Sequence, residues 1–467
     1  MFAQLIGTLS GWLYSYILIF LLIGGGLYFT VKTRCVQFRY FGECVRVVGE
    51  KPTVQGSVSS FHALMVSTAS RVGTGNIIGV STAICLGGYG AVFWMWVIAL
   101  VGGASAFIES TLAQIYKRKD EDGHFYGGPA YYIETCIKNR VLAVIFAVSL
   151  ILTYGAGFNM LASYNLQSTF SAYSFYHPTI TPVIIGAITA AFVFYCLTGG
   201  GRRVIKVTAV LVPFMGLLYV TVALFVVLTH IGLLPSVLGR ILTDAFDFPA
   251  IFGGLSGSCL VYGIKRGLYS NEAGVGSAPN AAAAADVSHP VKQGLVQMLS
   301  VFIDTLLLCT CTAMMLLCSG IEPTSAQAGA PYVQAALKSA MGGIGPVIIT
   351  VTLALFAVTT LLGNLYYCDN LLIYLNGKKR PDKDFMLGFR IVAALLIFIG
   401  AIISMGLAWD VADVLMGIMA LINVPVIMVI GGRAIAALGD YAKQRQAGQN
   451  PVFKAASIGL TDTECWK

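Results

Sequence analysis

Charged side chains are scarce in this sequence. Asp, Glu, Lys and Arg make up 11% of the 467 residues, whereas a soluble domain usually carries about 25%. Apolar residues make up 57% of the chain, and the mean hydropathy is +0.80. This composition excludes an ordinary soluble protein and predicts a membrane protein.

Several chemical motifs are also missing. The eleven cysteines include no CxxC pair and no Cys/His cluster with zinc spacing. A GxxxxGK[ST] phosphate loop is absent, so the chain carries no P-loop ATP motor of its own. The five histidines are scattered in or near predicted loops. We therefore expect no enzyme and no organic cofactor. We also expect no nucleic-acid partner, because the basic residues form short clusters between apolar runs.

The apolar residues form eleven runs of the length that crosses a bilayer, which is about 20 residues. These predicted spans are 12–31, 60–86, 91–116, 141–164, 180–199, 204–231, 248–287, 293–319, 343–374, 386–408 and 411–431. The seventh run is too long for one straight helix, and "KRGLYSNEAGVGSAP" interrupts it. The sequence predicts an all-α polytopic membrane protein with eleven transmembrane helices.

Lys and Arg residues indicate how these spans are oriented. They gather in alternate connections, namely 32–51, 117–140, 202–206, 378–390 and the tail from residue 433. The connections on the opposite side of the membrane hold only Arg240 and Lys338. Because cytoplasmic loops carry the excess of basic residues, the N-terminus is predicted outside and the C-terminus in the cytoplasm. The expected location is a bacterial inner or plasma membrane.

Two of the predicted spans carry glycines and polar residues near their middle. The second contains "ASRVGTGNIIG" (69–79), and the seventh contains the interruption quoted above. Gly inside a helix costs about 1 kcal/mol relative to Ala, and Pro about 3 kcal/mol. Irregular backbone at membrane depth is tolerated only where it is buried in protein or lines a cavity. Both spans are therefore predicted to be broken helices beside a binding site.

The two broken spans open two blocks of five helices, spans 2–6 and spans 7–11. Because five is odd, the second block must be inverted relative to the first, and such paired interruptions are typical of transporter sites. The predicted segments are an extra N-terminal helix with a basic cytoplasmic stretch (1–51), two repeats (52–240 and 241–435) and a cytoplasmic tail (436–467). Open helix ends attract a carboxylate at their N–H groups and Na⁺ or an ammonium at their carbonyls.

Five blocks of the sequence resemble the alanine/glycine:cation symporter family, also called sodium:alanine symporters. They are "VGTGNI", "GGPAYYIE", "RGLYSNEAGVGSAPNAAAAA", "HPVKQGLVQMLSVFIDTLLLCT" and "TTLLGN", and the similarity extends from about residue 55 to residue 430. The resemblance implies a LeuT-type fold of five plus five helices with one extra N-terminal helix. It also implies import of small neutral amino acids with Na⁺ or, in some members, with H⁺.

The resemblance also implies which residues form the site. The implied substrate-binding residues are Ser70, Gly73, Thr74, Gly75, Asn76, Tyr269, Ser270, Asn271, Gly274 and Asn364. Thr359 and Thr360, with backbone carbonyls near Gly73, are the implied sodium ligands. Without the resemblance, threonines in an apolar helix would be expected to bond their own helix carbonyls. Some members carry an acidic residue at the position of Ser70 and a tryptophan at that of Asn364. We therefore expect carbonyls or another carboxylate to hold the substrate amine, in a roomier or wetter pocket.

Charged residues inside the predicted spans need an explanation, because a charge at mid-membrane costs at least about 2.5 kcal/mol. Arg71 has two interpretations: it grips the substrate carboxylate, or it forms a structural ion pair with Glu272 or Asp304. We favour the ion pair, because a direct contact would lock a carboxylate that must be released. Lys265 and Arg266 are expected to extend towards water, and Glu109 and Asp369 are expected to be solvated near helix ends.

These observations predict a secondary active transporter that imports a small neutral amino acid of the alanine/glycine class. Na⁺-coupled symport by alternating access is the favoured mechanism. H⁺-coupled symport on the same fold stays an alternative, and a channel is a weaker one. The expected partners are the amino acid, the coupling ion Na⁺ and the lipid bilayer, and the sequence indicates no obligatory protein partner.

Overall fold

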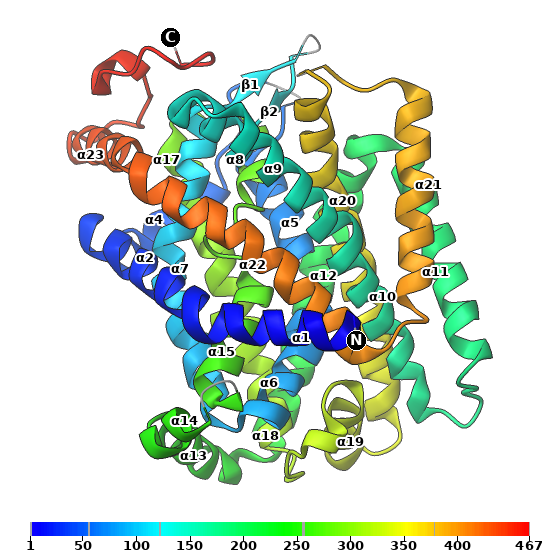
Figure 1. The fold of residues 1–467 in the computed structure, drawn as a ribbon. Helices are drawn as coiled ribbons and strands as arrows, with labels where there is room; N and C mark the ends of the chain where they lie inside the picture. The colour runs from blue at the N-terminus through cyan, green and yellow to red at the C-terminus, as the bar shows by residue number, and fades with distance from the viewer. Residues whose placement is uncertain (1, 55–56, 121–122, 255–256, 378, 467) are drawn as a thin grey trace.

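Nearly every element of this chain is a helix. The computed structural model describes residues 2–54, 57–120, 123–254, 257–377 and 379–466. Within these residues, one short antiparallel sheet pairs β1 (Arg118–Lys119) with β2 (Phe125–Tyr126). The sheet and the C-terminus lie at the same end of the molecule (Figure 1).

Eight helical stretches of the described chain are long and apolar enough to cross a membrane. They comprise α1 (Phe2–Leu13) continued by α2 (Ile19–Lys32), α7 (Gly90–Ile115), α9 (Arg140–Leu150) continued by α10 (Phe158–Ser168), α11 (Ile180–Thr198), α12 (Gly200–Thr229), α17 (Pro290–Val301) continued by α18 (Thr310–Leu317), α20 (Ile344–Leu375) and α22 (Met405–Ile430). π-Helical turns join the continued pairs at Tyr14–Leu18, Ile151–Gly157 and Phe302–Cys309. The prediction of an all-α polytopic membrane protein is confirmed.

Three of the eleven predicted spans are not single apolar helices of this kind. The predicted spans 60–86 and 248–287 are divided into shorter pieces. The third is α21 (Lys383–Gly400), which contains three charged residues and ends before residue 408, the predicted end of the span. The predicted seventh span also includes α14 (Phe248–Gly253), which is a separate short helix. Residues 255–256 of that span lie outside the described chain.

The first predicted break is present. α5 (Ser60–Arg71) is capped at its N-terminus by the Ser59 side chain and ends at Val72, whose ψ of 86° is not helical. The chain resumes as a π-helical turn over Gly75–Gly79 and continues as α6 (Val80–Gly87). The glycine-rich stretch therefore interrupts the helix where the sequence predicted.

The second predicted break is present as well. It separates α15 (Cys259–Asn271) from α16 (Pro279–Ala284). Three residues in the gap have positive φ angles: Glu272 at 52°, Gly274 at 82° and Gly276 at 91°. The left-handed region suits glycine and is uncommon for other residues, so the two glycines allow the chain to turn here.

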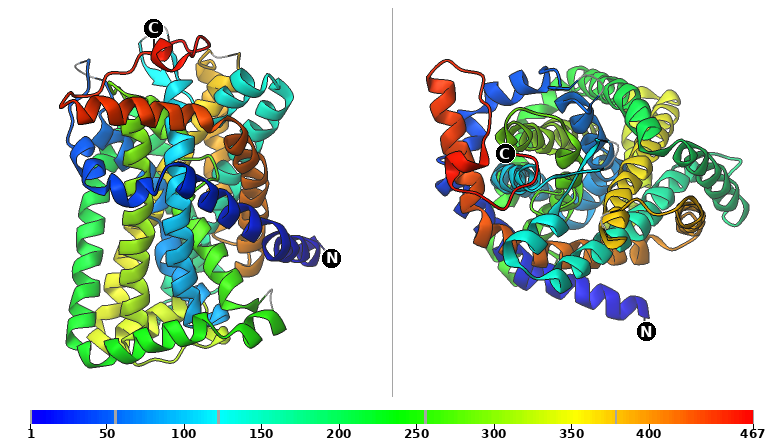
Figure 2. Two further views of the ribbon diagram at one scale, coloured as in Figure 1. Left: turned by 90° about the vertical axis from the view of Figure 1, so that its left-hand side faces the viewer. Right: turned by 90° about the horizontal axis from the view of Figure 1, so that it is seen from above.

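The broken helices lie inside the bundle, and other helices surround them. α7 packs against both α15 and α17, and α20 packs against α5. α1 and α2 cross the outside of the bundle obliquely and contact α22 and α7, while α11 and α21 pair at one edge (Figures 1 and 2). The remaining helices are α3 (Val36–Arg39), α4 (Phe41–Val48), α8 (Pro129–Tyr132), α13 (Leu234–Ala245), α19 (Ala330–Met341) and α23 (Gly432–Gln446).

Candidate functional site

Side chains from both helix breaks converge on one carboxylate, Asp304. Asn76, just after the first break, donates its amide to Asp304 Oδ1 at 2.7 Å. Ser270, near the end of α15, donates its hydroxyl to Oδ2 at 2.6 Å, and Thr305 donates to the same oxygen at 2.8 Å. Asp304 is fully buried in the π-helical turn between α17 and α18. A residue predicted only as a candidate partner of Arg71 thus joins the two breaks.

Asn76 also fixes the backbone of the first break. Its side-chain oxygen accepts a 2.8 Å hydrogen bond from the Gly73 amide, and its main-chain carbonyl accepts one of 2.7 Å from the Thr312 hydroxyl. The Thr74 hydroxyl accepts a 2.9 Å hydrogen bond from Asn165. The polar residues around the glycines therefore give partners to groups that the interrupted helix leaves open.

An aromatic group covers this region from the side of α15. The Tyr269 ring lies 4.6 Å from the Phe158 ring and 4.8 Å from the Trp409 ring, measured between centroids. Gly75 is pressed against Tyr269, so a Cβ at this position would lie only 2.5 Å from a ring carbon. The side chain of Asn271 accepts a hydrogen bond from the backbone amide two residues further on and so shapes the second break.

A second buried carboxylate, Glu272, lies near Ser70. The Ser70 hydroxyl is 3.4 Å from a Glu272 oxygen and 2.6 Å from the side-chain oxygen of Asn364. Ser277 donates to the other Glu272 oxygen at 2.5 Å, and Asn364 donates to Asn159 at 2.9 Å. The structure thus brings Ser70, Glu272 and Asn364 together, although they come from α5, from the second break and from α20.

The two predicted sodium ligands differ in their surroundings. The Thr359 hydroxyl is 3.0 Å from each of two carbonyls of its own helix, at Leu355 and Phe356, as is usual for a helical threonine. The buried Thr360 hydroxyl has no hydrogen-bond partner among the described residues. It faces Gly73, because a Cβ on that glycine would overlap it. Thr360 therefore offers a free hard oxygen beside the first break, which fits an alkali cation.

Arg71 does not form the predicted ion pair. It is 2% exposed, and its Nη1 donates to the Gln297 carbonyl at 3.2 Å. No ion pair joins it to Glu272 or Asp304 within the described chain, because the guanidinium bonds to α17 instead. Its Nε and Nη2 have no hydrogen-bond partner among the described residues. Its charge still interacts with Glu272, Asp304 and Glu109 at longer range.

Glu109 is not solvated, contrary to expectation. It is fully buried, and it accepts hydrogen bonds from the Gly274 amide at 3.3 Å and from the Asn423 side chain at 2.8 Å. Asn423 also donates to the Gly274 carbonyl at 2.9 Å and accepts from Tyr132 at 2.5 Å. Glu109 therefore supports the second break from behind. The sequence signal for this buried role was a single carboxylate within an apolar run.

Lys265 and Arg266 do not extend towards water, because both are buried against Asp413. The carboxylate of Asp413 lies 3.1 Å from the Lys265 ammonium and 2.8 Å from the Arg266 guanidinium. Lys265 also donates to Ser10 at 2.9 Å, and Arg266 stacks on Trp409 at 3.9 Å. These contacts connect α15 with α22 and with the first helix of the chain.

Comparisons with known proteins point to one family. The sequence model described as "Sodium:alanine symporter family" matches residues 1–455. The chain is similar to the amino-acid carrier protein AlsT of Bacillus subtilis, with 43% identity over 100% of this chain and 98% of that protein. It is 41% identical to the probable sodium/glutamine symporter GlnT of the same organism, over 99% and 96% of the two chains. It is 35% identical to the sodium/alanine symporter AgcS of Methanococcus maripaludis, over 93% and 96%.

A solved structure supports the fold. The crystal structure of MhsT in complex with L-phenylalanine matches with a TM-score of 0.59 and 13% sequence identity, over 84% of this chain and 96% of that chain. At this identity the similarity concerns the fold alone, and it gives this chain a LeuT-like fold.

Proposed function

The chain belongs to the sodium:alanine symporter family, and on this premise we propose that it imports a small neutral amino acid of the alanine/glycine class by alternating access. The family consists of sodium-coupled amino-acid transporters and not of enzymes. The observation that carries the proposal is the junction of two helix breaks at Asp304, to which Asn76 and Ser270 both donate.

We propose eleven spans for this transporter. The eight continuous stretches are joined by the two broken helices and by α21. Residues 52–240 and 241–435 then form two inverted five-helix repeats, after an N-terminal part (1–51) and before a tail (436–467). The alternation of basic residues supports an outside N-terminus and a cytoplasmic C-terminus in a bacterial inner or plasma membrane.

The substrate binds between the two breaks in this proposal. The backbone amides at the first break suit the carboxylate of the amino acid, because N–H groups at a helix end attract anions. The Gly73 amide, which donates to the Asn76 side chain in this structure, would exchange that partner for the substrate. Glu272, beside Ser70 and Asn364, is the carboxylate that suits the ammonium group. Releasing both charged ends of the substrate requires only that the broken helices separate from their neighbours.

Na⁺ binds beside the first break, between the Thr360 hydroxyl and the carbonyls near Gly73. Thr360 is the better ligand of the two threonines, because Thr359 would have to release hydrogen bonds within its own helix. One Na⁺ that enters down about 100 mV and a tenfold gradient supplies about 3.7 kcal/mol, which supports roughly 500-fold accumulation.

A proton is the alternative coupling ion. Three fully or almost fully buried carboxylates, Glu109, Glu272 and Asp304, lie within reach of one buried cation, Arg71. Binding of a proton would remove one of these excess negative charges from a region where charge is costly. This observation keeps H⁺-coupled symport as the second candidate.

Uptake of labelled alanine into proteoliposomes tests the proposal. We expect saturable uptake driven by an inward Na⁺ gradient, and competition by glycine, serine and other small neutral amino acids. Replacing Na⁺ by choline, by Li⁺ or by a pH gradient identifies the coupling ion. Flux that neither saturates nor depends on any ion gradient would contradict symport and would indicate a channel.

A further inference from the structure

The C-terminal segment of the chain lies across one end of the helix bundle, as α23 followed by residues 450–466 (Figures 1 and 2). It contacts Ser288 in the short connection between α16 and α17. The Phe453 amide donates to the Ser288 carbonyl at 2.9 Å, and the Ser288 hydroxyl donates to the Pro451 carbonyl at 2.8 Å. The connection is therefore hydrogen-bonded to the tail in both directions.

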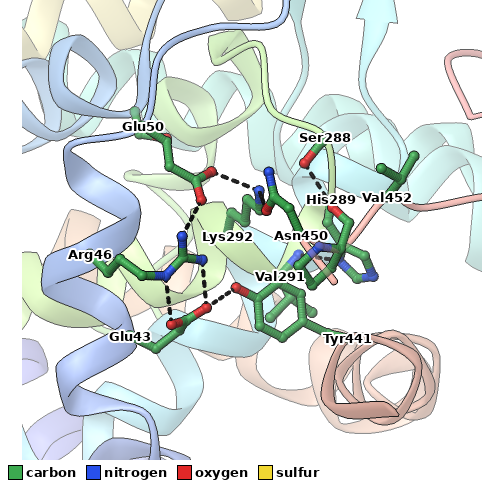
Figure 3. A network of polar contacts seen from close by, with 12 residues as sticks. Glu43, Arg46, Glu50, Ser288, His289, Val291, Lys292, Tyr441, Asn450 and Val452 are labelled. Carbon is green, nitrogen blue, oxygen red and sulfur yellow. Dashed lines mark hydrogen bonds and ion pairs between the residues drawn. The ribbon is translucent and has the colours of Figure 1, made fainter. Parts of the chain in front are cut away.

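The next residue, His289, is enclosed by the same segment. Its ring is fully buried and lies 5.0 Å from both the Tyr441 ring and the Phe453 ring, measured between centroids. Its Nε2 is 3.3 Å from the Asp440 carboxylate, while its Nδ1 accepts from the Val291 amide and caps α17. Figure 3 shows His289 between α17 and the C-terminal helix.

Charged side chains extend this network to α4. Lys292, near the start of α17, is 2.6 Å from a Glu50 oxygen and 2.8 Å from the Asn450 side-chain oxygen (Figure 3). Glu50 also pairs with Arg46 at 2.7 Å, and Arg46 pairs with Glu43, which accepts a hydrogen bond from Tyr441. The network thus connects α4, the start of α17 and the C-terminal segment.

The far end of the tail holds the end of α16 through α7. The Trp466 indole donates to the Gln114 carbonyl at 2.7 Å. The Gln114 side chain donates to the carbonyls of Ala282 and Ala285 at 2.5 and 2.9 Å. Lys117 lies 4.6 Å from the Trp466 ring centroid and donates to the Ala285 carbonyl at 3.1 Å.

Residues 285–289, which the C-terminal segment holds, are also hydrogen-bonded to the stretch that precedes α5. The Asp286 amide donates to the Val58 carbonyl at 2.9 Å. The Asp286 carboxylate accepts from the Thr53 hydroxyl and from the Val54 amide, both at 2.6 Å. Each broken helix has one half at this end of the bundle, namely α5 and α16. Both halves therefore meet at residues 285–289, the connection that the C-terminal segment holds.

We propose that the C-terminal segment is a clamp, formed by Asp440, Tyr441 and residues 450–466, which holds residues 285–289 and so keeps α5 and α16 together at this end of the substrate path. α16 has six residues and follows a break, so it depends on tertiary contacts for its position. Release of the clamp is the step that lets the site open at this end, which rests on the alternating-access function proposed above.

Hydrogen exchange on the full-length protein in lipid nanodiscs tests the clamp without measuring transport. Phe453→Ala removes the ring between His289 and Trp466. Lys454→Ala, at an exposed neighbouring position, is the matched control. We expect the amides of 279–289 to exchange about tenfold faster in Phe453→Ala, a change of about 1.4 kcal/mol in local opening, and at the original rate in the control. Unchanged exchange in Phe453→Ala would overturn the clamp.

Ser288→Ala provides a milder variant, because it removes one hydrogen bond and leaves the aromatic contacts in place. A smaller acceleration in the same segment is expected, and its absence counts against the clamp. Uptake into proteoliposomes is then compared for the same proteins. Faster exchange with an unchanged transport rate would overturn the role of the clamp in opening. If the variants exchange faster but the unmodified protein transports no amino acid, the proposed function is contradicted, while the clamp is supported as a structural element.

Discussion

Asn76 and Asp304 lie 228 residues apart in the sequence and share a 2.7 Å hydrogen bond where the two helix breaks meet. Ser270 donates to the other oxygen of the same carboxylate. Because the two donors lie beside different breaks, Asp304 couples the position of one broken helix to that of the other.

Replacing Asp304 should disrupt this junction. Asp304→Ala removes the carboxylate that accepts from the Asn76 amide and the Ser270 hydroxyl, and leaves them the weaker contacts with the Cys309 sulfur and, for Asn76, the backbone carbonyl of residue 304. The loss of a good acceptor costs up to about 1–3 kcal/mol for each buried donor. We expect a lower unfolding temperature and at least a roughly tenfold loss of uptake, with a smaller loss of stability in Asp304→Asn. Thermal unfolding and uptake measure both effects. Asp384→Asn, at an exposed position on α21, is the control. Normal uptake by Asp304→Ala would contradict the role of Asp304 as the junction of the two breaks.

The two threonines of α20 should respond differently to removal of their hydroxyls. Thr360→Val removes the unpaired oxygen that faces Gly73, whereas Thr359→Val removes a hydroxyl that bonds its own helix. We expect the Na⁺ concentration for half-maximal uptake to rise about tenfold in Thr360→Val, as for loss of about 1.4 kcal/mol of binding. It should change much less in Thr359→Val. A larger effect at Thr359 would place the ion elsewhere.

Arg71 variants separate the two roles considered for this residue. Arg71→Gln leaves the buried carboxylates Glu109, Glu272 and Asp304 without their nearby cation, so it should lower both the unfolding temperature and the uptake rate. Arg71→Lys keeps the charge and should retain more of both. If Arg71 instead grips the substrate, both variants would raise KM for alanine and leave the unfolding temperature unchanged.

Acid should loosen the C-terminal clamp through His289. Burial lowers the pKa of the His289 imidazole to about 4, against the opposing effect of Asp440 and with a further lowering by Lys292. A released imidazole titrates near its ordinary value of about 6.5, so between these values the released state binds the extra proton. The stability of the clamp is therefore complete above about pH 6.5 and falls as the pH drops towards 4.

Hydrogen exchange of residues 279–289 at about pH 7 and about pH 5, corrected for intrinsic rates, checks this pH dependence. We expect more frequent opening at the lower pH. His289→Gln should open more often at both values but lose the difference between them, because it has no titrating group in this range. If His289→Gln shows a pH effect of the same size, the pH dependence of opening arises from another residue.

The sequence by itself determined the class of the protein and the places where its helices break. Few charges and long apolar runs leave no alternative to a membrane protein, and Gly73, Gly75, Gly274 and Gly276 with Pro279 raise the local cost of a continuous helix. These properties depend on composition and on neighbouring residues, so they can be predicted before any packing is known. Five long and specific blocks of the sequence then indicated the symporter family.

Only the tertiary structure decided which polar groups meet. The sequence could not choose between Thr359 and Thr360, paired Arg71 with the wrong group, and placed Glu109, Lys265 and Arg266 near water. Each outcome depends on a contact with a distant helix: Gly73 for Thr360, Gln297 for Arg71, Asn423 for Glu109, and Asp413 for Lys265 and Arg266. Burial and pairing of a charge are set by the packing of whole helices, and a local pattern contains no information about that neighbour.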